Sequence, residues 1–354
     1  MPSKSTSPNC VGVIGAGSFG TTVAMLLAHN VDVLLYVHRE GVSEGGQPIR
    51  TAAGHPLAAN ITLTYCLEEI AERCPVIFPV VPSGAFRIML KKLAPHLRSN
   101  HMLIHGTKGL DVRWPQPTDS DSLPKLTRED VKTMSELIRE ESIIHQVGCL
   151  SGPNLARELA QGQPAGTVVA SVSETVLAQG QQLLRNDRFQ VYSSTDLLGV
   201  ELCGVLKNVI AIGTGCLSGL GYGRNAQSLL ISRGLVEMIH LGQAMGARVQ
   251  PFLGLAGLGD LVTTCTNRLS RNYTLGYRLA QGVAPYQLVQ NTKETAEGIH
   301  TVKAARSLID HYQIRSPIIE IVYRMLFENL AVPEAIQYLM KHPVRSVDVD
   351  FLNE

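Results

Sequence analysis

The chain has 354 residues, of which 45% are hydrophobic and 17% are charged, so it is long enough for two domains with a core each. Lys and Arg together number 31 and Asp and Glu 30, which excludes the strong positive field of a nucleic-acid-binding protein. The 7 cysteines form no C-x-x-C pair and the 11 histidines no H-E-x-x-H motif, so we expect neither a disulfide framework nor a metal site.

Residues 1–9 are polar and lack the apolar segment of a signal peptide. The apolar stretch 202–220 contains Lys207, Asn208 and several glycines, which makes it a poor membrane span. We therefore expect a soluble cytoplasmic protein.

A strand, a glycine-rich turn and a helix are predicted in succession between Val11 and Asn30. Gly15, Gly17 and Gly20 match the pattern G-x-G-x-x-G. In that pattern the first glycine permits a tight turn, the second lets the backbone approach a pyrophosphate, and the third lets the helix pack on the strand. The amides at the start of the helix, near Ser18, would face the phosphates. The sequence therefore predicts a dinucleotide site.

A second strand, 31–37, is followed by His38, Arg39 and Glu40. A carboxylate at this point usually holds the ribose 2′-hydroxyl of NAD, whereas an arginine accommodates the 2′-phosphate of NADP. His38 takes the acidic position, and the guanidinium of Arg39 could grip a phosphate with two hydrogen bonds. NADP(H) is favoured on this ground. NAD(H) and a merely solvated Arg39 remain as alternatives.

Strand-like runs alternate with helical stretches up to residue 194, which predicts a parallel sheet covered by helices. From residue 195 helical periods take over. The predicted fold is an α/β Rossmann-type dinucleotide-binding domain followed by an all-α domain. Segment 111–130 reads as a loop that leads into a helix at 129–141. The further strands are expected at 75–81, 101–105, 146–150, 166–171 and 189–193. Two late helices are expected at 317–326 and 333–340. The expected domains are 10–194 and 195–345, with tails at 1–9 and 346–354.

Five predicted strand ends carry residues that a plain loop does not need. In an open α/β sheet, ligands bind beyond the carboxyl ends of the strands, so a parallel sheet would gather these residues along one cleft. Turn formation alone is the alternative, and a lone lysine such as Lys108 is often simply solvated. The five ends are Gly15–Gly20, His38–Arg39, Pro82–Ser83, Lys108–Gly109 and Ser151–Asn154.

Two charged residues of the second half lie in strongly apolar surroundings. Lys207 falls within Glu201–Ile212, which is apolar around most of a helix, and Asp260 within the glycine-rich run Gly254–Leu261. Desolvation lowers the pKa of a lysine, so Lys207 could act as a general acid or base near neutral pH, with Asp260 as its partner. The alternatives are a lysine that extends to solvent and an aspartate that caps a helix.

Ser270, Arg271 and Asn272 precede an amphipathic helix. A serine at the N-cap, free helical amides and a guanidinium together would suit a phosphate group. Ordinary capping by Ser270 explains the same residues equally well.

Seven segments of the chain resemble, in the same order, those of the bacterial soluble NAD(P)-dependent glycerol-3-phosphate dehydrogenases. They are GAGSFGTTVA, VVPSGAFR, GTKGLD, LSGPNLARELA, GVELCGVLKNVIAI, GLAGLGDLVTTCT and LSRN. The likeness runs from about Val11 to about Met340. It implies a helical domain like that of 6-phosphogluconate dehydrogenase. It also implies that Lys207 protonates the ketone oxygen of dihydroxyacetone phosphate while the nicotinamide delivers a hydride, giving sn-glycerol 3-phosphate.

The resemblance also assigns residues to the substrate and the cofactor. The catalytic residues would be Lys207 and Asp260. The substrate residues would be Lys108, Gly152, Asn154, Lys207, Asp260, Ser270, Arg271 and Asn272. The cofactor residues would be Gly15, Gly17, Ser18, Phe19, Gly20, His38, Arg39, Lys108, Ala156, Arg271, Thr295 and Glu297. A role in supplying glycerol 3-phosphate for phospholipid synthesis is implied as well, and a homodimer is expected.

Several positions depart from the family pattern. Asn154 replaces Ser or Thr, Arg224 replaces an acidic residue, Thr295 replaces a small aliphatic one, and the loop 111–130 is longer than usual. These differences bear on substrate affinity and cofactor preference. Two rival functions remain. The first is a related hydroxy-acid dehydrogenase, a function that would not lead us to expect LSRN after GLAGLGD. The second is a non-catalytic nucleotide sensor, which could have lost Lys207, Asp260 or Arg271.

Overall fold

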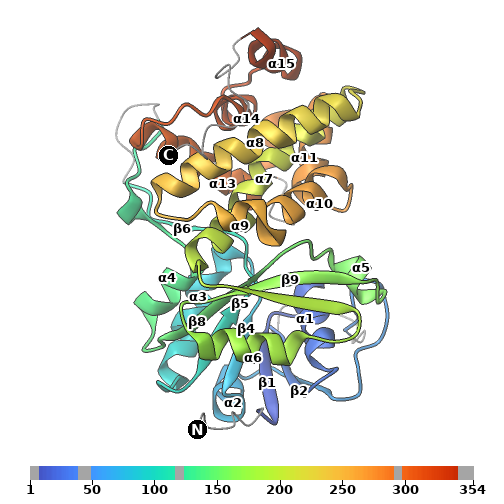
Figure 1. Ribbon diagram of the computed structural model, residues 1–354, viewed down its shortest axis with the longest axis vertical. Helices are drawn as coiled ribbons and strands as arrows, with labels where there is room; N and C mark the ends of the chain where they lie inside the picture. Colours follow the sequence, from blue (N-terminus) through green and yellow to red (C-terminus); the bar gives the residue numbers. More distant parts are fainter. Residues whose placement is uncertain (1–7, 39–48, 116–122, 291–296, 342–354) are drawn as a thin grey trace. The chain divides into compact units, whose positions relative to one another are not determined.

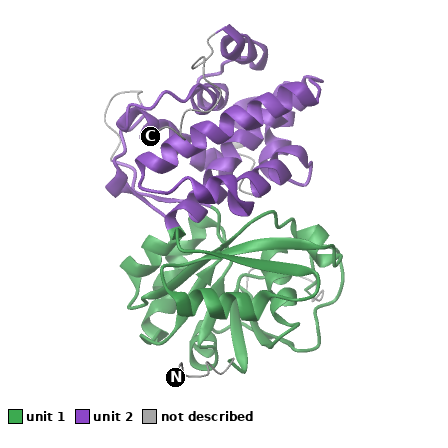
Figure 2. Cartoon of the chain, viewed as in Figure 1, with its two compact units in different colours: residues 1–108, 134–197 green, residues 109–133, 198–354 purple. Residues whose placement is uncertain are grey.

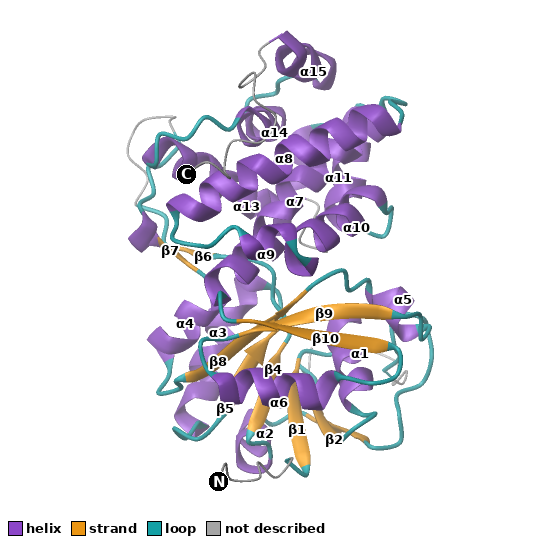
Figure 3. Cartoon of the chain, in the orientation of Figure 1, coloured by secondary structure: helices purple, strands orange, loops and turns teal. Residues whose placement is uncertain are grey.

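The computed structural model describes residues 8–38, 49–115, 123–290 and 297–341. The chain forms two compact units (Figure 2): residues 1–108 with 134–197, and residues 109–133 with 198–354. The first unit contains the large sheet and the second is built mainly of helices, as Figures 1 and 3 show. The expected α/β domain followed by an all-α domain is thus confirmed.

The sheet of the first unit has 8 strands in the order β10-β9-β8-β5-β4-β1-β2-β3. From β8 to β3 every neighbouring pair is parallel, so the ends of β1, β2, β4, β5 and β8 lie at one edge. Strand β3 was not predicted. The strands are β1 (Cys10–Ile14), β2 (Asp32–Tyr36), β3 (Ile61–Thr64), β4 (Val76–Pro79), β5 (Met102–His105), β8 (Gln146–Ser151), β9 (Ala165–Ala170) and β10 (Phe189–Ser194).

Strands β9 and β10 run opposite to the rest, because β9 pairs antiparallel with β8 and β10 pairs parallel with β9. The prediction of a wholly parallel sheet was therefore wrong for these two strands. The helix between β8 and β9, α5 (Ala156–Ala160), has only 5 residues. At about 1.5 Å per residue it is too short to carry the chain back along a strand that rises about 3.3 Å per residue, so the chain reverses instead.

Five helices cover the two faces of the sheet, and alternate residues of β1 enter the two cores. Val11 and Val13 pack with α1 (Ser18–Leu27) and α6 (Glu174–Leu184). Ile14 packs on the other face with the remaining three helices. This burial on both sides explains why the strands read as continuous apolar runs. The three helices are α2 (Leu67–Arg73), α3 (Ser83–Leu93) and α4 (Met134–Glu141).

Residues 109–133 leave the sheet unit and pack with the helical one. The amide of Leu126 donates to Ser307 Oγ (2.7 Å), and that hydroxyl donates to the carbonyl of Pro124 (2.9 Å). The expected first domain, 10–194, included this segment, whereas the observed division places residues 109–133 in the helical unit. The two hydrogen bonds and the burial of Leu126 tie the segment to helix α13 (Glu297–His311).

The prediction that a helix begins at residue 129 was wrong. Residues Arg128–Asp130 form a single turn of 3₁₀ helix, closed by reciprocal capping between Thr127 and Asp130. Strand β7 (Val131–Lys132) follows and pairs antiparallel with β6 (Asp111–Val112), so α4 starts only at Met134. The two strands hold residues 131 and 132 extended and delay the helix.

The helical unit surrounds α7 (Leu197–Gly219). By length and composition alone α7 could cross a membrane, but 94% of its most apolar window is buried inside the protein, as in a core helix. A Cβ at Gly215 would lie 2.0 Å from the carbonyl of Tyr273, so only glycine permits this crossing with α11 (Arg271–Ala280). The two predicted late helices are confirmed. The other helices are α8 (Arg224–Ala244), α9 (Gln250–Leu253), α10 (Asp260–Thr266), α11 (Arg271–Ala280), α12 (Pro285–Gln290), α14 (Pro317–Phe327) and α15 (Val332–Lys341).

Candidate active site

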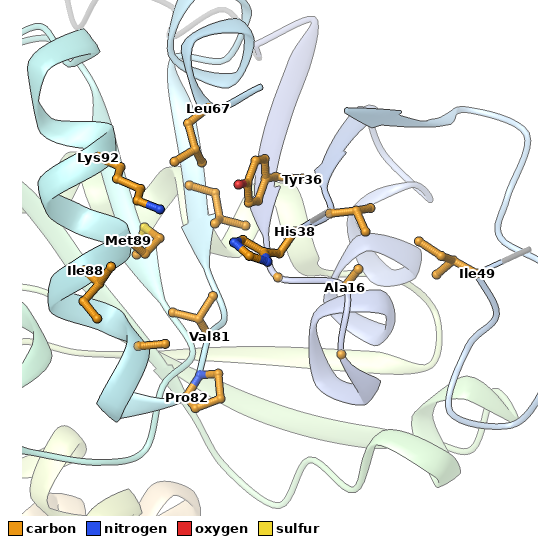
Figure 4. A pocket seen from close by; sticks show the side chains of 15 residues that line it. Ala16, Tyr36, His38, Ile49, Leu67, Val81, Pro82, Ile88, Met89 and Lys92 are labelled. Carbon is orange, nitrogen blue, oxygen red and sulfur yellow. The ribbon is translucent and has the colours of Figure 1, made fainter. Parts of the chain in front are cut away.

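A pocket of about 520 Å³ opens in the sheet unit where β1, β2 and β4 end (Figure 4). Its walls come from the glycine turn, the end of β2 and one side of α3. This is the edge at which an open α/β sheet binds its ligand. The lining residues are Ile14, Gly15, Ala16, Gly17, Tyr36, Val37, His38, Ile49, Leu67, Val81, Pro82, Ala85, Ile88, Met89 and Lys92.

The glycine turn has the geometry that the sequence pattern predicts. Gly15 has a φ of 118°, in the region that favours glycine. A Cβ at Gly20 would lie 1.8 Å from the Gly15 carbonyl oxygen, whereas one at Gly17 would meet no atom within 4 Å. The helix therefore sits tightly against the turn, and open space faces Gly17 at the N-cap of α1. These residues fit a dinucleotide pyrophosphate.

Two basic side chains line the pocket beyond the glycine turn. His38 is exposed at the end of β2, and Lys92 extends from α3 toward the side of the pocket where Tyr36 and His38 lie (Figure 4). Arg39 lies outside the described residues, so its proposed contact with a 2′-phosphate stays a prediction. Sequence analysis missed Lys92 because it resembles any surface lysine. The available signal was its spacing after Ala85 and Met89, on one face of a helix that follows a strand end.

A second group of residues joins the ends of β5 and β8. Lys108 Nζ donates to the carbonyl of Gly152 (3.0 Å). Asn154 donates from Nδ2 to the carbonyl of Gly166 (3.0 Å) and accepts at Oδ1 from Thr167 Oγ1 (2.8 Å). The structure thus brings together the three predicted substrate residues of the sheet unit and fixes the orientation of the Asn154 amide.

The remaining described cofactor candidates of the sheet unit lie on or beside α1. Ser18 begins the helix and is exposed. Phe19 packs under the end of β5, because a Cβ at Gly106 would lie 3.1 Å from its ring. The carbonyl of Ala156 accepts a hydrogen bond from Thr22 Oγ1 (3.3 Å) and thereby ties α5 to α1.

In the helical unit, Lys207 and Asp260 form a buried ion pair. Lys207 Nζ lies 2.5 Å from Asp260 Oδ1 and 2.6 Å from Thr264 Oγ1, and that hydroxyl donates to Asp260 Oδ1 (3.2 Å). Lys207 is 5% exposed and Asp260 is 2% exposed. The predicted pairing is therefore present, and the lysine does not extend to solvent.

The carboxylate of Asp260 stabilises the protonated ammonium of Lys207, which opposes the effect of desolvation considered from the sequence alone. Asp260 is the first residue of α10 and is placed there by a π-helical turn, Leu255–Gly259. Its carboxylate accepts hydrogen bonds from Lys207 Nζ and from Thr264 Oγ1.

Three helices are linked by hydrogen bonds beside Lys207. Asn272 Nδ2 on α11 donates to Asn208 Oδ1 on α7 (2.8 Å), and the amide of Gly298 on α13 donates to Asn272 Oδ1 (3.1 Å). A Cβ at Gly298 would lie 2.5 Å from Asn272 Oδ1, so the contact requires glycine. Glu297, half-buried, begins α13, while Thr295 lies outside the described residues.

Ser270 caps α11. Its Oγ accepts a hydrogen bond from the amide of Tyr273 (3.2 Å), as ordinary capping requires. Arg271, the first residue of the helix, is exposed, whereas Asn272 is buried. The backbone amides of the first turn have no partner within the helix, so a phosphate at this terminus stays a prediction compatible with the cap.

The sequence matches two family models, described as the N-terminus and the C-terminus of NAD-dependent glycerol-3-phosphate dehydrogenase, over residues 10–177 and 196–337. It is 36% identical over 345 residues to glycerol-3-phosphate dehydrogenase [NAD(P)+] of Teredinibacter turnerae, with 96% of each chain covered. The chain belongs to the glycerol-3-phosphate dehydrogenase family.

Further relatives of the dehydrogenase agree with this assignment. The enzyme of Geobacter metallireducens is 38% identical over 338 residues, which cover 93% of this chain and 96% of that one. The crystal structure of glycerol-3-phosphate dehydrogenase from Coxiella burnetii has a TM-score of 0.81 at 32% identity, covering 94% of this chain and 99% of that chain. The predicted family and enzyme class are thereby confirmed: the dehydrogenase is an NAD(P)-dependent oxidoreductase.

Proposed function

We propose that the dehydrogenase interconverts dihydroxyacetone phosphate and sn-glycerol 3-phosphate, with Lys207 as the general acid and base. The observation that carries this proposal is the buried cluster of Lys207, Asp260 and Thr264, which lies in a chain of this family. The bound reduced nicotinamide supplies a hydride to the ketone carbon. Lys207 Nζ supplies the proton that the ketone oxygen gains.

Asp260 keeps Lys207 protonated and in place. Its carboxylate accepts from Nζ at 2.5 Å, and the hydroxyl of Thr264 fixes the same nitrogen from a second direction. A protonated ammonium held in a site 5% exposed or less donates its proton without first reorganising solvent. In the oxidation direction the neutral amine takes the hydroxyl proton back, and Asp260 stabilises the ammonium that forms.

The N-terminus of α11 is proposed as the phosphate site. The amides of Arg271 and Asn272 in the first turn of this 10-residue helix have no partner within the helix, Ser270 can still donate its hydroxyl hydrogen, and Arg271 adds a charged fork. Asn272 is held by Asn208 and Gly298, so its orientation is fixed before a ligand arrives. Lys108, Gly152 and Asn154 stay proposed substrate residues on the strength of the resemblance and of their mutual contacts.

The pocket of the sheet unit is proposed to hold the adenosine half of the cofactor. The glycine turn fits the pyrophosphate, and His38 lies at the end of β2, where the ribose 2′ position is read. Lys92 brings an ammonium group to the same pocket (Figure 4), which favours the 2′-phosphate of NADP over the 2′-hydroxyl of NAD. Arg39, Glu297 and Thr295 complete the proposed cofactor set.

The test is the loss of nicotinamide absorbance with dihydroxyacetone phosphate, run in parallel with NADPH and NADH. Unphosphorylated dihydroxyacetone is the control for the phosphate site, and a 2-oxo acid is the control for the rival hydroxy-acid function. We expect turnover with dihydroxyacetone phosphate and faster use of NADPH. Turnover of the 2-oxo acid alone would overturn the proposal. No turnover by folded protein that binds NADPH would favour the sensor.

Three further proposals rest on the family. The dehydrogenase would work in the cytoplasm, would supply glycerol 3-phosphate for phospholipid synthesis, and would form a homodimer through its helical unit. Sedimentation of the purified chain tests the last of these, because a monomer at all concentrations would contradict it. Growth dependence on added glycerol 3-phosphate in a deletion strain tests the metabolic role.

A further inference from the structure

Two cysteines face each other at the edge of the sheet opposite the glycine turn. Cys10 is the first residue of β1, and Cys74 follows α2 just before β4. Their Sγ atoms lie 3.6 Å apart although the residues are 64 positions apart in sequence. Cys10 is half-buried and Cys74 is fully buried. Cys10 is thus the more accessible residue of the pair, and Cys74 the shielded one.

The surroundings favour a thiolate at Cys10. A hydrogen bond with the Cys74 thiol lowers the pKa of Cys10 to about 7; the positive charge of Arg73 acts in the same direction, while burial and the negative charge of Asp32 oppose it. The hydrogen bond with Cys10 and burial raise the pKa of Cys74. As pH rises, Cys10 therefore loses its proton first, and Cys74 keeps its proton. Thiolates of this kind are the ones that peroxides oxidise.

The other five cysteines differ from Cys10 in burial. Cys66 is exposed, and Cys149, Cys203, Cys216 and Cys265 are buried. Burial raises the pKa of Cys216 and of Cys265 to about 12, so these two thiols hold their protons. Cys66 provides an internal comparison, because this residue is more exposed than Cys10.

We propose that Cys10 and Cys74 form an oxidation site for hydrogen peroxide, with Cys10 as the attacking thiolate and Cys74 as the resolving thiol. The Cys10 sulfur attacks one peroxide oxygen, so an S–O bond forms, the O–O bond breaks and hydroxide leaves. The Cys74 thiol then gives its proton to this hydroxide, and its sulfur displaces a second hydroxide from Cys10. That hydroxide takes from solvent the proton that Cys10 released on ionisation, and becomes water. Two thiols lose two electrons in total, and one peroxide becomes two waters.

The disulfide is compatible with catalysis. The two sulfurs lie 3.6 Å apart and need to approach to about 2.05 Å. The bond would join the amino ends of β1 and β4, while the nucleotide pocket lies at their carboxyl ends. It would close a loop that holds β1, α1, β2, β3 and α2, and would restrict the unfolded chain without entering the pocket.

The test is a titration of the intact protein with hydrogen peroxide, followed by alkylation, trypsin digestion and mass spectrometry without reduction. We expect peptide 5–39 to be linked to peptide 74–87 before Cys66 loses its thiol, and dithiothreitol to release the two. The melting temperature of the oxidised protein should rise. The KM values for both substrates should stay unchanged. The proposal is independent of the substrate assigned above.

Three variants sharpen the result. Cys66→Ser should cross-link like the parent protein. Cys74→Ser should leave a sulfenic acid at Cys10 that dimedone traps, and Cys10→Ser should leave Cys74 reduced and the melting temperature unaffected by peroxide. Oxidation of Cys66 ahead of Cys10, with no linked peptide from folded protein, would overturn the proposal. An equal response of Cys10→Ser and the parent protein would overturn it as well.

Discussion

Replacing Lys207 by methionine separates the chemistry of this lysine from its contribution to folding. Methionine retains the length of the side chain and removes the ammonium. Loss of a general acid typically lowers turnover by roughly 10²–10⁴, which equals about 3–5 kcal/mol of transition-state stabilisation. Because Lys207 Nζ makes its contacts inside the helical unit, the cofactor pocket of the sheet unit should keep its affinity for NADPH.

The same substitution should also destabilise the protein. It leaves the carboxylate of Asp260, 2% exposed, with Thr264 but without its cation. Removing one partner of a buried ion pair costs about 3–5 kcal/mol. The double variant Lys207→Met with Asp260→Asn removes both charges, so most of this stability should return. Turnover should not return with it.

The measurements are kcat and KM with dihydroxyacetone phosphate, NADPH binding by fluorescence, and urea unfolding of the parent, single and double variants. Near-normal turnover in Lys207→Met would refute the assignment of this residue as acid and base. Recovery of both stability and turnover in the double variant would show instead that Lys207 serves folding alone.

Three other predictions follow from individual contacts. Gly298→Ala places a Cβ 2.5 Å from Asn272 Oδ1, so it should displace that amide and weaken substrate binding by about 1–3 kcal/mol, measured as KM for dihydroxyacetone phosphate. Lys92→Ala should raise KM for NADPH a few-fold more than KM for NADH, whereas exposed Lys91→Ala, which does not line the pocket, should change neither. Burial raises the pKa of Glu237 to about 8 from 4.5, so the stability from its protonated form is fully present below about pH 4.5 and is lost as pH rises to about 8. Glu237→Gln should flatten this pH dependence of unfolding, whose slope reaches about 1.4 kcal/mol per pH unit.

Each of these has a contradicting result. An unchanged KM for dihydroxyacetone phosphate in Gly298→Ala would show that Asn272 does not bind substrate. Equal effects of Lys92→Ala and Lys91→Ala on the two cofactors would remove Lys92 from the cofactor site. An identical pH profile of unfolding in Glu237→Gln and in the parent protein would show that Glu237 is not the group responsible for this pH dependence.

Short-range chemistry was readable from the sequence. The roles of Gly15 and Gly20 follow from spacing, because a turn and a helix start are built from neighbouring residues. The pairing of Lys207 with Asp260 spans 53 positions, yet it was predictable, because each charge lies in an apolar segment that offers few other partners. The 2.5 Å contact through which the Asp260 carboxylate opposes the effect of burial on Lys207 could not be predicted from the sequence.

Long-range geometry was harder to predict. The reversed direction of β9 and β10 depends on which strand each meets, and their sequences suit either direction. Strand β3 has only 4 residues, two of them exposed, so its alternation is too short to recognise. The delayed start of α4 depends on the pairing of β7 with β6, which no local propensity encodes. Lys92 differs from Lys91 only in that it lies on the side of α3 that faces the pocket.

The excursion of residues 109–133 has a consequence for the protein during its synthesis. The amide of Leu126 pairs with Ser307, which is made 181 residues later. At about 5–20 residues per second the ribosome needs roughly 10 to 40 s to supply that partner. The last strand of the sheet, by contrast, is made by residue 194. The nascent chain therefore passes through a stage in which the sheet can close while Leu126, fully buried in the finished protein, is still exposed to chaperones.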